Sequence, residues 1–370
     1  MQQFGLSISK LAISEVTETN TTSGQHRTIF LLSRMIDPST LPTAADRPTL
    51  AELEPLARVA LKHYGITATG LQNLRYFNNA TYRVVAPDGQ QFVLRVTCNH
   101  HSAARLRSEM QWLSAMQSIA GVWVPDPVAS LDGQLVVRAS VSSLSEPRWC
   151  NVFHWLDGTH IVEEEMSAAD FRAMGAACAN LHAKSATFNP PPEFDRPHWD
   201  EQYCVDPGAG NTLERMTTYL RCHFPPEAAG RFVQLAGQAR ELMGRLRPDL
   251  LSYGLIHADF HPGNCLFRPN GVAFLDFEDL GSGYFLYDIA SALFGSLERH
   301  DYLRLTEAFS KAYASTRPLP SDFARQLLLF QLLRAVFLTH LVLAQGELDG
   351  NAWWEGYVIG KLRQLLGLTR

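Results

Sequence analysis

One short segment, residues 257–279, constrains this chain more than any other. It reads His-Ala-Asp-Phe-His-Pro-Gly-Asn, then a short apolar run, then Asp-Phe-Glu-Asp. Asn264 follows Asp259 by five positions, and Asp276 comes twelve positions later. Kinase-type phosphoryl transfer needs a carboxylate beside the attacking hydroxyl, and an amide oxygen and a second carboxylate to hold Mg²⁺ on the nucleotide phosphates. These three side chains supply those groups in that order.

The sequence between these residues predicts a hairpin. Residues 265–267 and 272–275 have the apolar composition of short strands, and Asn270-Gly271 between them is a hairpin signal. Such a hairpin folds Asp276 back toward Asn264, so that both side chains reach one Mg²⁺ ion. Carboxylate and amide oxygens are ligands that suit this hard cation.

Two other interpretations of the segment stay open at this point. Asp, Asn and His are common in polar loops, where they cap and turn the chain. Alternatively, His257, Asp259 and His261 stand at alternating positions, as metal ligands do in some metal-dependent hydrolases. The hydrolase interpretation leaves Asn264 and the hairpin unexplained.

The segment resembles the aminoglycoside phosphotransferase and choline kinase superfamily, which is related to the protein kinases. That family has His-x-Asp-x-His-x-x-Asn, then Ile-Asp-Phe-Glu-Asp, and later a Tyr-Asp-Leu-Ala block, which residues 287–290 match as Tyr-Asp-Ile-Ala. The resemblance implies that Asp259 is the catalytic base, that Asn264 and Asp276 hold Mg²⁺, and that ATP is the phosphoryl donor.

The resemblance also implies supporting roles. His257 and Asp288 brace the catalytic loop without taking part in the chemistry. Glu278 and Asp279, beside the metal-binding aspartate, either face a cationic acceptor or support the Mg²⁺ ligands.

The fold implied is α+β: a bilobal protein-kinase-like fold with a small antiparallel-sheet N-lobe and a larger, mainly helical C-lobe. We expect a disordered N-terminal extension over residues 1–45, which are rich in Ser, Thr and isolated charges. The N-lobe is expected over 46–156 and the C-lobe, with the catalytic loop and acceptor site, over 157–370.

The expected N-lobe carries the candidate nucleotide contacts. Residues 74–85 and 91–96 are predicted strands, joined by the turn signal Pro-Asp-Gly-Gln. Arg95 lies where kinases have their nucleotide-binding lysine, and Glu109, on a predicted helix over 103–116, has the spacing to pair with it. The tip over 77–82 lacks glycine, but Asn79 tolerates a left-handed backbone conformation and partly replaces it.

The hinge to the large lobe is expected after a strand over 149–155. In this architecture the hinge backbone reads the adenine edge, which makes Phe153 and Trp155 candidate nucleotide contacts. Beyond the hinge, apolar spacing predicts helices over 167–185, 228–247, 287–297, 320–345 and 353–366.

Composition excludes several classes of protein. The net charge of −5 argues against a nucleic-acid binder. Acidic residues outnumber basic ones over 156–370, which favours a cationic or neutral acceptor. Six scattered cysteines without a C-x-x-C pair suit reduced thiols and a cytoplasmic location. The most apolar stretch, 326–345, is interrupted by Arg334 and His340, so we expect a buried helix and no membrane partner.

The sequence thus predicts an ATP- and Mg²⁺-dependent phosphotransferase acting on a hydroxyl of a small molecule, such as an amino alcohol, homoserine, choline or an aminoglycoside. Two alternatives stay open: a Ser/Thr protein kinase of the same superfamily, and a nucleotide-binding regulator without transfer activity. Arg95 and the glycine-poor loop favour the regulator, whereas the complete Asp259, Asn264 and Asp276 set argues against it. Trp353, Trp354 and Tyr357 either form a cage for an ammonium group or pack on the core.

Overall fold

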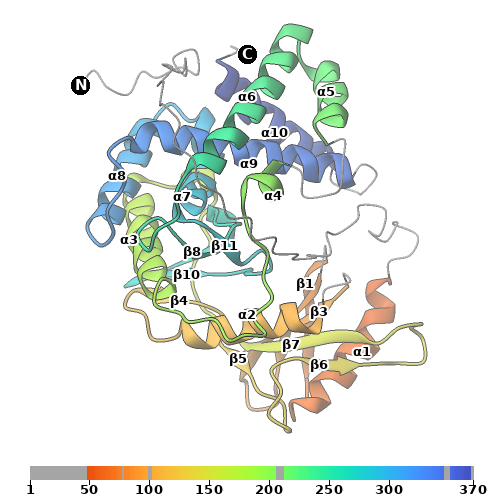
Figure 1. Cartoon of the computed structure of the whole chain (residues 1–370). Coiled ribbons are helices and arrows are strands. Elements are labelled where there is room, and N and C mark those ends of the chain that lie inside the picture. Colours follow the sequence, from red (N-terminus) through yellow and green to blue (C-terminus); the bar gives the residue numbers. More distant parts are fainter. Residues whose placement is uncertain (1–47, 77–78, 99–101, 206–211, 346–350, 368–370) are drawn as a thin grey trace, which may run out of the picture.

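The chain has two lobes, a smaller one built on a sheet and a larger, mainly helical one (Figure 1). The computed structural model describes residues 48–76, 79–98, 102–205, 212–345 and 351–367. The arrangement confirms the predicted α+β, kinase-like fold class. The N-terminal extension expected over residues 1–45 lies outside the described residues.

The N-lobe is built on one antiparallel sheet in the order β1-β2-β3-β7-β5, with β6 paired to β7. Its strands are β1 (Gly70–Tyr76), β2 (Asn79–Val85), β3 (Gln91–Thr97), β5 (Pro127–Val128), β6 (Val137–Ala139) and β7 (Arg148–His154). Every second side chain of β2 is buried, as expected for a strand with one face on a core. That core is shared with α1 (Leu50–His63), which begins in a capping box formed by Thr49 and Glu52.

One prediction for this lobe was wrong in detail. The single strand expected over 74–85 is two strands, β1 and β2, paired antiparallel to each other. The two residues between them, 77–78, are outside the described chain, whereas residues 79–82, the rest of the glycine-poor tip, belong to β2.

Helix α2 (Ala103–Ala115) connects the two lobes physically. Its apolar side chains, including Met110 and Leu113, belong to the large core that continues into the C-lobe. The ring of Trp112 lies 5.2 Å, between centroids, from that of Phe277 in the Asp-Phe-Glu-Asp segment. The helix therefore supports the candidate site from the N-lobe side.

The C-lobe is a set of helices around two small sheets (Figure 1). Its helices are α3 (Ala168–Ser185), α4 (Glu201–Val205), α5 (Thr212–His223), α6 (Pro226–Arg245), α7 (Phe285–Phe294), α8 (Tyr302–Ala314), α9 (Phe323–Gln345) and α10 (Asn351–Leu366). All the predicted helices are present with slightly shifted ends, whereas α8 was not predicted. No helix within the described residues combines the length and apolarity needed to cross a bilayer.

The two small sheets form the floor under the candidate site. One has the order β4-β10-β9 and the other pairs β11 with β8. The strands are β4 (Val122–Trp123), β8 (Tyr253–Ile256), β9 (Cys265–Arg268), β10 (Gly271–Phe274) and β11 (Gly281–Tyr284). Strand β4 runs parallel to β10, although it precedes the hinge in the sequence.

The contact between α3 and α8 gives a test of the packing. A Cβ atom added at Gly175 would lie 2.3 Å from the backbone oxygen of Phe309, which is too close for the two helices to stay in place. We expect Gly175→Ala to lower the free energy of unfolding by about 1–3 kcal/mol, as overpacking does. Gly230→Ala, on an exposed position of α6 with no neighbour within 4 Å, should instead stabilise by about 0.5–1 kcal/mol. Urea unfolding of both variants checks this, and equal stabilities would contradict the packing.

Candidate active site

A buried carboxylate holds the loop that carries the candidate catalytic residues. Asp288, on α7, is fully buried, and its two oxygens accept hydrogen bonds from successive backbone N–H groups. Oδ2 lies 2.8 Å from the nitrogen of His257, and Oδ1 lies 2.7 Å from that of Ala258. Ala258 has a φ of 67°, a left-handed conformation that is rare for alanine and has to be imposed by its surroundings.

A second buried side chain, His182 on α3, supports this carboxylate. Its Nε2 lies 2.9 Å from Oδ2 of Asp288, and its Nδ1 lies 2.9 Å from the hydroxyl of Tyr313. Burial lowers the pKa of His182 despite the neighbouring carboxylate. A neutral imidazole that donates to Asp288 and accepts from Tyr313 satisfies both contacts. The sequence analysis missed His182, because nothing in the sequence sets this histidine apart from other buried ones.

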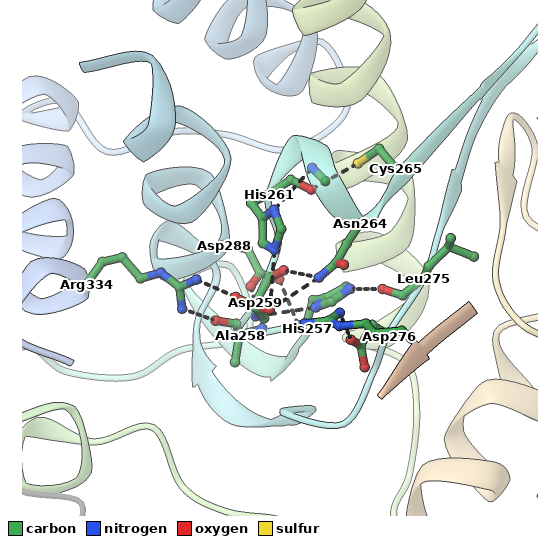
Figure 2. A network of polar contacts seen from close by, with 12 residues as sticks. His257, Ala258, Asp259, His261, Asn264, Cys265, Leu275, Asp276, Asp288 and Arg334 are labelled. Atoms are coloured by element: carbon green, nitrogen blue, oxygen red, sulfur yellow. Dashed lines mark hydrogen bonds and ion pairs between the residues drawn. The ribbon is translucent and has the colours of Figure 1, made fainter. Parts of the chain in front are cut away.

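Asp259 lies at the centre of the site (Figure 2). Its Oδ1 pairs with Arg334 of α9, while its Oδ2 lies 3.2 Å from Nδ2 of Asn264 and 3.4 Å from Nε2 of His261. Burial alone would raise the pKa of Asp259, but its contacts with His261 and Arg334 outweigh burial and hold the pKa well below its usual range. The carboxylate is therefore ionised at neutral pH.

The predicted hairpin is present and brings the two candidate metal ligands together. Strands β9 and β10 pair antiparallel, and the N–H of Leu275 donates to the backbone oxygen of Asn264 at 2.8 Å. Asp276, the next residue, has a φ of 61°. Figure 2 shows Asn264 and Asp276 on opposite sides of the His257 side chain.

The side chains of Asn264 and Asp276 fit a hard cation. Nδ2 of Asn264 donates to the backbone oxygen of Asp259 at 3.0 Å and to its carboxylate, which leaves Oδ1 without a partner among the described residues. Oδ2 of Asp276 lies 3.1 Å from Nη1 of Arg75, which is largely exposed. An amide oxygen and a carboxylate whose partner is exposed to solvent are suitable Mg²⁺ ligands.

The hydrolase interpretation does not survive this geometry. Nε2 of His257 bonds to the backbone oxygen of Leu275 at 2.8 Å, and its Nδ1 accepts from the N–H of Asp259 at 3.3 Å. Both ring nitrogens are engaged, so this histidine braces the loop as the family resemblance implied. Across the described ranges no group of three or more His, Cys, Asp and Glu side chains is placed to hold a metal ion.

In the N-lobe, the predicted pairing of Arg95 with Glu109 is present. The two buried side chains form a two-pronged ion pair with distances of 2.9 and 2.8 Å, and Nε of Arg95 also bonds to Asn151 at 3.2 Å. Burial opposes the charge of Arg95, but Glu109 outweighs burial and raises its pKa. The guanidinium lies 5.5 Å from the ring centre of Phe153, so this residue contributes packing through its side chain.

The ends of β1 and β2 reach across to the C-lobe. Arg75 pairs with Asp276 as described, and Nδ2 of Asn79 donates to Glu278 at 2.8 Å. Both contacts join residues about 200 positions apart in the sequence. Asn79 therefore meets the Asp-Phe-Glu-Asp segment, a contact that the sequence did not suggest.

Two backbone N–H groups of the hinge are already hydrogen-bonded within the protein and cannot donate to a nucleotide base. The N–H of His154 donates to the oxygen of Asp126 at 2.9 Å, and that of Trp155 donates to Gln91 at 3.2 Å. The ring of Trp155 packs under Arg83, at 4.9 Å from its centre. Because these N–H groups are occupied, hydrogen-bond donation to an adenine edge is not available from Trp155.

An arginine that the sequence analysis missed holds the segment after Asp276. Buried Arg196 donates to the backbone oxygens of Phe277 at 3.2 Å, Glu278 at 2.5 Å and Leu280 at 2.5 Å. The backbone oxygen of Asp279 accepts from the indole of Trp199 at 2.9 Å. The acidic segment thus has its backbone fixed by donors from the loop before α4.

Negative charge accumulates here. Burial, with Asp259 and Glu278 nearby, raises the pKa of Asp279 to about 7. Burial and Glu278 also raise the pKa of Asp276, although Arg75 acts against this. The site therefore has an excess of carboxylates that a bound cation would relieve.

Comparison with known proteins agrees with this geometry. The model of the phosphotransferase enzyme family matches residues 72–320, and the chain belongs to this family. The predicted membership of the aminoglycoside phosphotransferase superfamily is thereby confirmed, and the chain is a kinase.

Individual relatives are also kinases. Amicoumacin kinase of Bacillus subtilis (strain 168) is 27% identical over 248 residues, which cover 66% of this chain and 68% of that one. The solved structure of a microcompartment-associated aminopropanol kinase has a TM-score of 0.70 at 25% identity, covering 84% of this chain and 95% of that chain. An amicoumacin kinase in complex with AMP-PNP, Ca²⁺ and Ami has a TM-score of 0.67 at 19% identity. The match covers 87% of this chain and 98% of that chain, and the two share the fold.

The raised pKa of Asp279 predicts a pH dependence of stability. A carboxyl whose pKa rises on folding stabilises the folded state fully below its unfolded pKa of about 4, and this contribution is lost as the pH rises through about 7. Asp279→Asn removes this loss. From pH 5 to pH 8 the free energy of unfolding of the variant should rise, relative to that of the wild type, by on the order of 1–2 kcal/mol. This figure allows for the partial exposure of the side chain.

Urea unfolding at the two pH values, without divalent cations, measures the gain. Exposed Glu241 on α6 provides the control as Glu241→Gln. A difference between Asp279→Asn and wild type that is the same at pH 5 and pH 8 would show that Asp279 has an ordinary pKa.

Proposed function

We propose that this kinase transfers the γ-phosphoryl group of ATP to a hydroxyl of a small molecule that also carries a positive charge, an amino alcohol in the simplest case. The observation that carries the proposal is the convergence of Asp259, Asn264 and Asp276. Asn264 contacts Asp259 through its side chain and is linked to the residue before Asp276 through its backbone. Two of the three non-glycine residues with positive φ in the described chain, Ala258 and Asp276, lie in this site, where strain is typical of function.

Asp259 would orient the acceptor hydroxyl and take its proton. The transition state of phosphoryl transfer is loose, so the base accepts the proton late and needs little basicity. A carboxylate with a lowered pKa suits this role because it stays ionised and able to accept a hydrogen bond from the hydroxyl. Its two oxygens are already oriented by Arg334 and Asn264 before any substrate binds.

The metal would be held by Oδ1 of Asn264 and the carboxylate of Asp276. Mg²⁺ bound there supplies positive charge to the β- and γ-phosphate oxygens. Arg95, fixed by Glu109, and Arg75, which reaches the site from β1, would add charge on the phosphate side. The backbone N–H groups of His154 and Trp155 are already hydrogen-bonded within the protein. The adenine ring of ATP would therefore contact the hinge backbone from Leu156 onward.

The acceptor class follows from charge and from the relatives. Asp259, Glu278 and Asp279 make the site acidic, which favours an ammonium group beside the reacting hydroxyl. The names of the relatives, aminopropanol kinase and amicoumacin kinase, point to small-molecule acceptors. The ring of Tyr357 lies 6.2 Å from that of Phe294, between centres, and contacts Lys361. These contacts favour packing on the core over a cage for an ammonium group. The side chains of Trp353 and Trp354, the rest of the expected cage, lie outside the described structure.

The test is Asp259→Asn. We expect turnover to fall by about 10²–10⁴-fold, the usual contribution of a general base, while the Kd for Mg²⁺–ATP stays within a factor of about three. ADP release would be measured with aminopropanol, choline, homoserine, kanamycin, spectinomycin and casein, with Glu241→Gln as the control.

Two results would contradict the proposal. Near-normal turnover of Asp259→Asn would show that Asp259 is not the base. A wild type that binds Mg²⁺–ATP but releases no ADP with any acceptor would identify the chain as a nucleotide-binding regulator, and turnover with casein alone would identify a protein kinase.

A further inference from the structure

Arg334 on α9 is a buried cation that contacts the candidate base from outside the catalytic loop. Its side chain is 5% exposed, in a helix whose neighbouring positions are buried and apolar. Its Nη1 donates to the backbone oxygen of Ala258 at 3.2 Å, and its Nη2 pairs with Oδ1 of Asp259. Figure 2 shows it approaching these two residues from the side opposite Asp276.

Burying the guanidinium of Arg334 here lowers the stability of the protein unless its donors are hydrogen-bonded. Desolvating an ion costs several kcal/mol, and only well-formed contacts compensate for the loss of water. Here the contacts are the two oxygens of successive residues in the loop, one from the backbone and one from the side chain. Since the guanidinium is planar and rigid, bonding to both fixes the carboxylate of Asp259 relative to its own backbone.

The remaining contacts of Asp259 show what this arrangement achieves. Oδ2 has Nδ2 of Asn264 at 3.2 Å and Nε2 of His261 at 3.4 Å, whereas Oδ1 pairs with Arg334. Without Arg334 the carboxylate would keep donors on one side only and could turn toward His261. With Arg334 in place, both oxygens of the carboxylate are held, Oδ1 by α9 and Oδ2 by the loop itself.

We infer that Arg334 is a positioning residue: it anchors Oδ1 of Asp259 and so fixes the orientation in which the carboxylate receives the acceptor hydroxyl. This inference rests on the proposed function, in which Asp259 is the base. Arg334 acts through Asp259 and touches neither substrate. A lysine at this place would carry the charge but could not bond to both oxygens in one plane.

The experiment compares Arg334→Met and Arg334→Lys with Arg325→Met. Arg325 lies on the same helix and is exposed, so the control makes the same substitution without the contact. With aminopropanol, or the best acceptor of the panel, kcat of Arg334→Met should fall about 10²-fold, as small misplacements of reacting groups do. Arg334→Lys should recover part of this loss, and the KM for ATP should change less than twofold in both variants.

A crystal structure of Arg334→Met separates positioning from general destabilisation and does not depend on finding the acceptor. The inference expects the Asp259 carboxylate to turn away from its wild-type orientation while Ala258 and Asp288 stay in place. Should Arg334→Met be too unstable to crystallise, the structure of Arg334→Lys, with the same expectation for Oδ1, replaces it.

The inference is overturned if the carboxylate keeps its wild-type orientation, or if kcat of Arg334→Met equals that of Arg325→Met. It is also overturned if kcat and the KM for ATP change together, since that indicates a purely structural role. A wild type that transfers phosphate to no acceptor refutes the proposed function, whereas the orientation of Asp259 in the variant still decides whether Arg334 positions it.

Discussion

The site depends on one fully buried carboxylate, that of Asp288, which accepts hydrogen bonds from the N–H groups of His257 and Ala258 and contacts His182. These contacts satisfy backbone donors that would otherwise be buried without partners, at a cost of about 1–3 kcal/mol each. They also hold Ala258 in its left-handed conformation, which turns the chain so that Asp259 leaves the core and meets Asn264. Without the Asp288 carboxylate, the loop would lose the hydrogen bonds that hold its backbone in this conformation.

Around this anchor, charges of opposite sign lie on opposite sides of the Asp259 carboxylate. Arg334 lies behind Asp259, while Asp276, Glu278 and Asp279 gather in front of it. The backbone of the acidic segment is fixed by Arg196, which donates to three of its carbonyl oxygens. These charges are held in place by the protein before any ligand binds, and preorganised charge is a main source of rate enhancement in enzymes.

The local part of this arrangement could be predicted from the sequence. The hairpin that brings Asp276 to Asn264 follows from Asn270-Gly271 between two apolar runs, and the ion pair of Arg95 with Glu109 follows from the kinase-like spacing. The helix α8 was missed although Leu305, Phe309 and Tyr313 recur at helical spacing and are buried, so a signal existed.

The non-local part could not be predicted. Arg334 follows Asp259 by 75 positions, and Arg75 precedes Asp276 by 201 positions. In the sequence, Arg334 reads only as an interruption of an apolar stretch. Its contact depends on how α9 packs against the loop, and no spacing rule encodes this. His182 and Arg196 act through tertiary packing in the same way.

The central claim is that Asn264 and Asp276 hold one metal ion beside Asp259. Anomalous diffraction from crystals grown with Mn²⁺ and AMP-PNP tests it most directly. The account predicts a metal peak at about 2.1 Å from Oδ1 of Asn264 and from a carboxylate oxygen of Asp276, with Asp259 outside the ligand set. A metal bound instead by Asp259 together with His257 or His261, or a nucleotide whose phosphates lie away from Asp276, would contradict it.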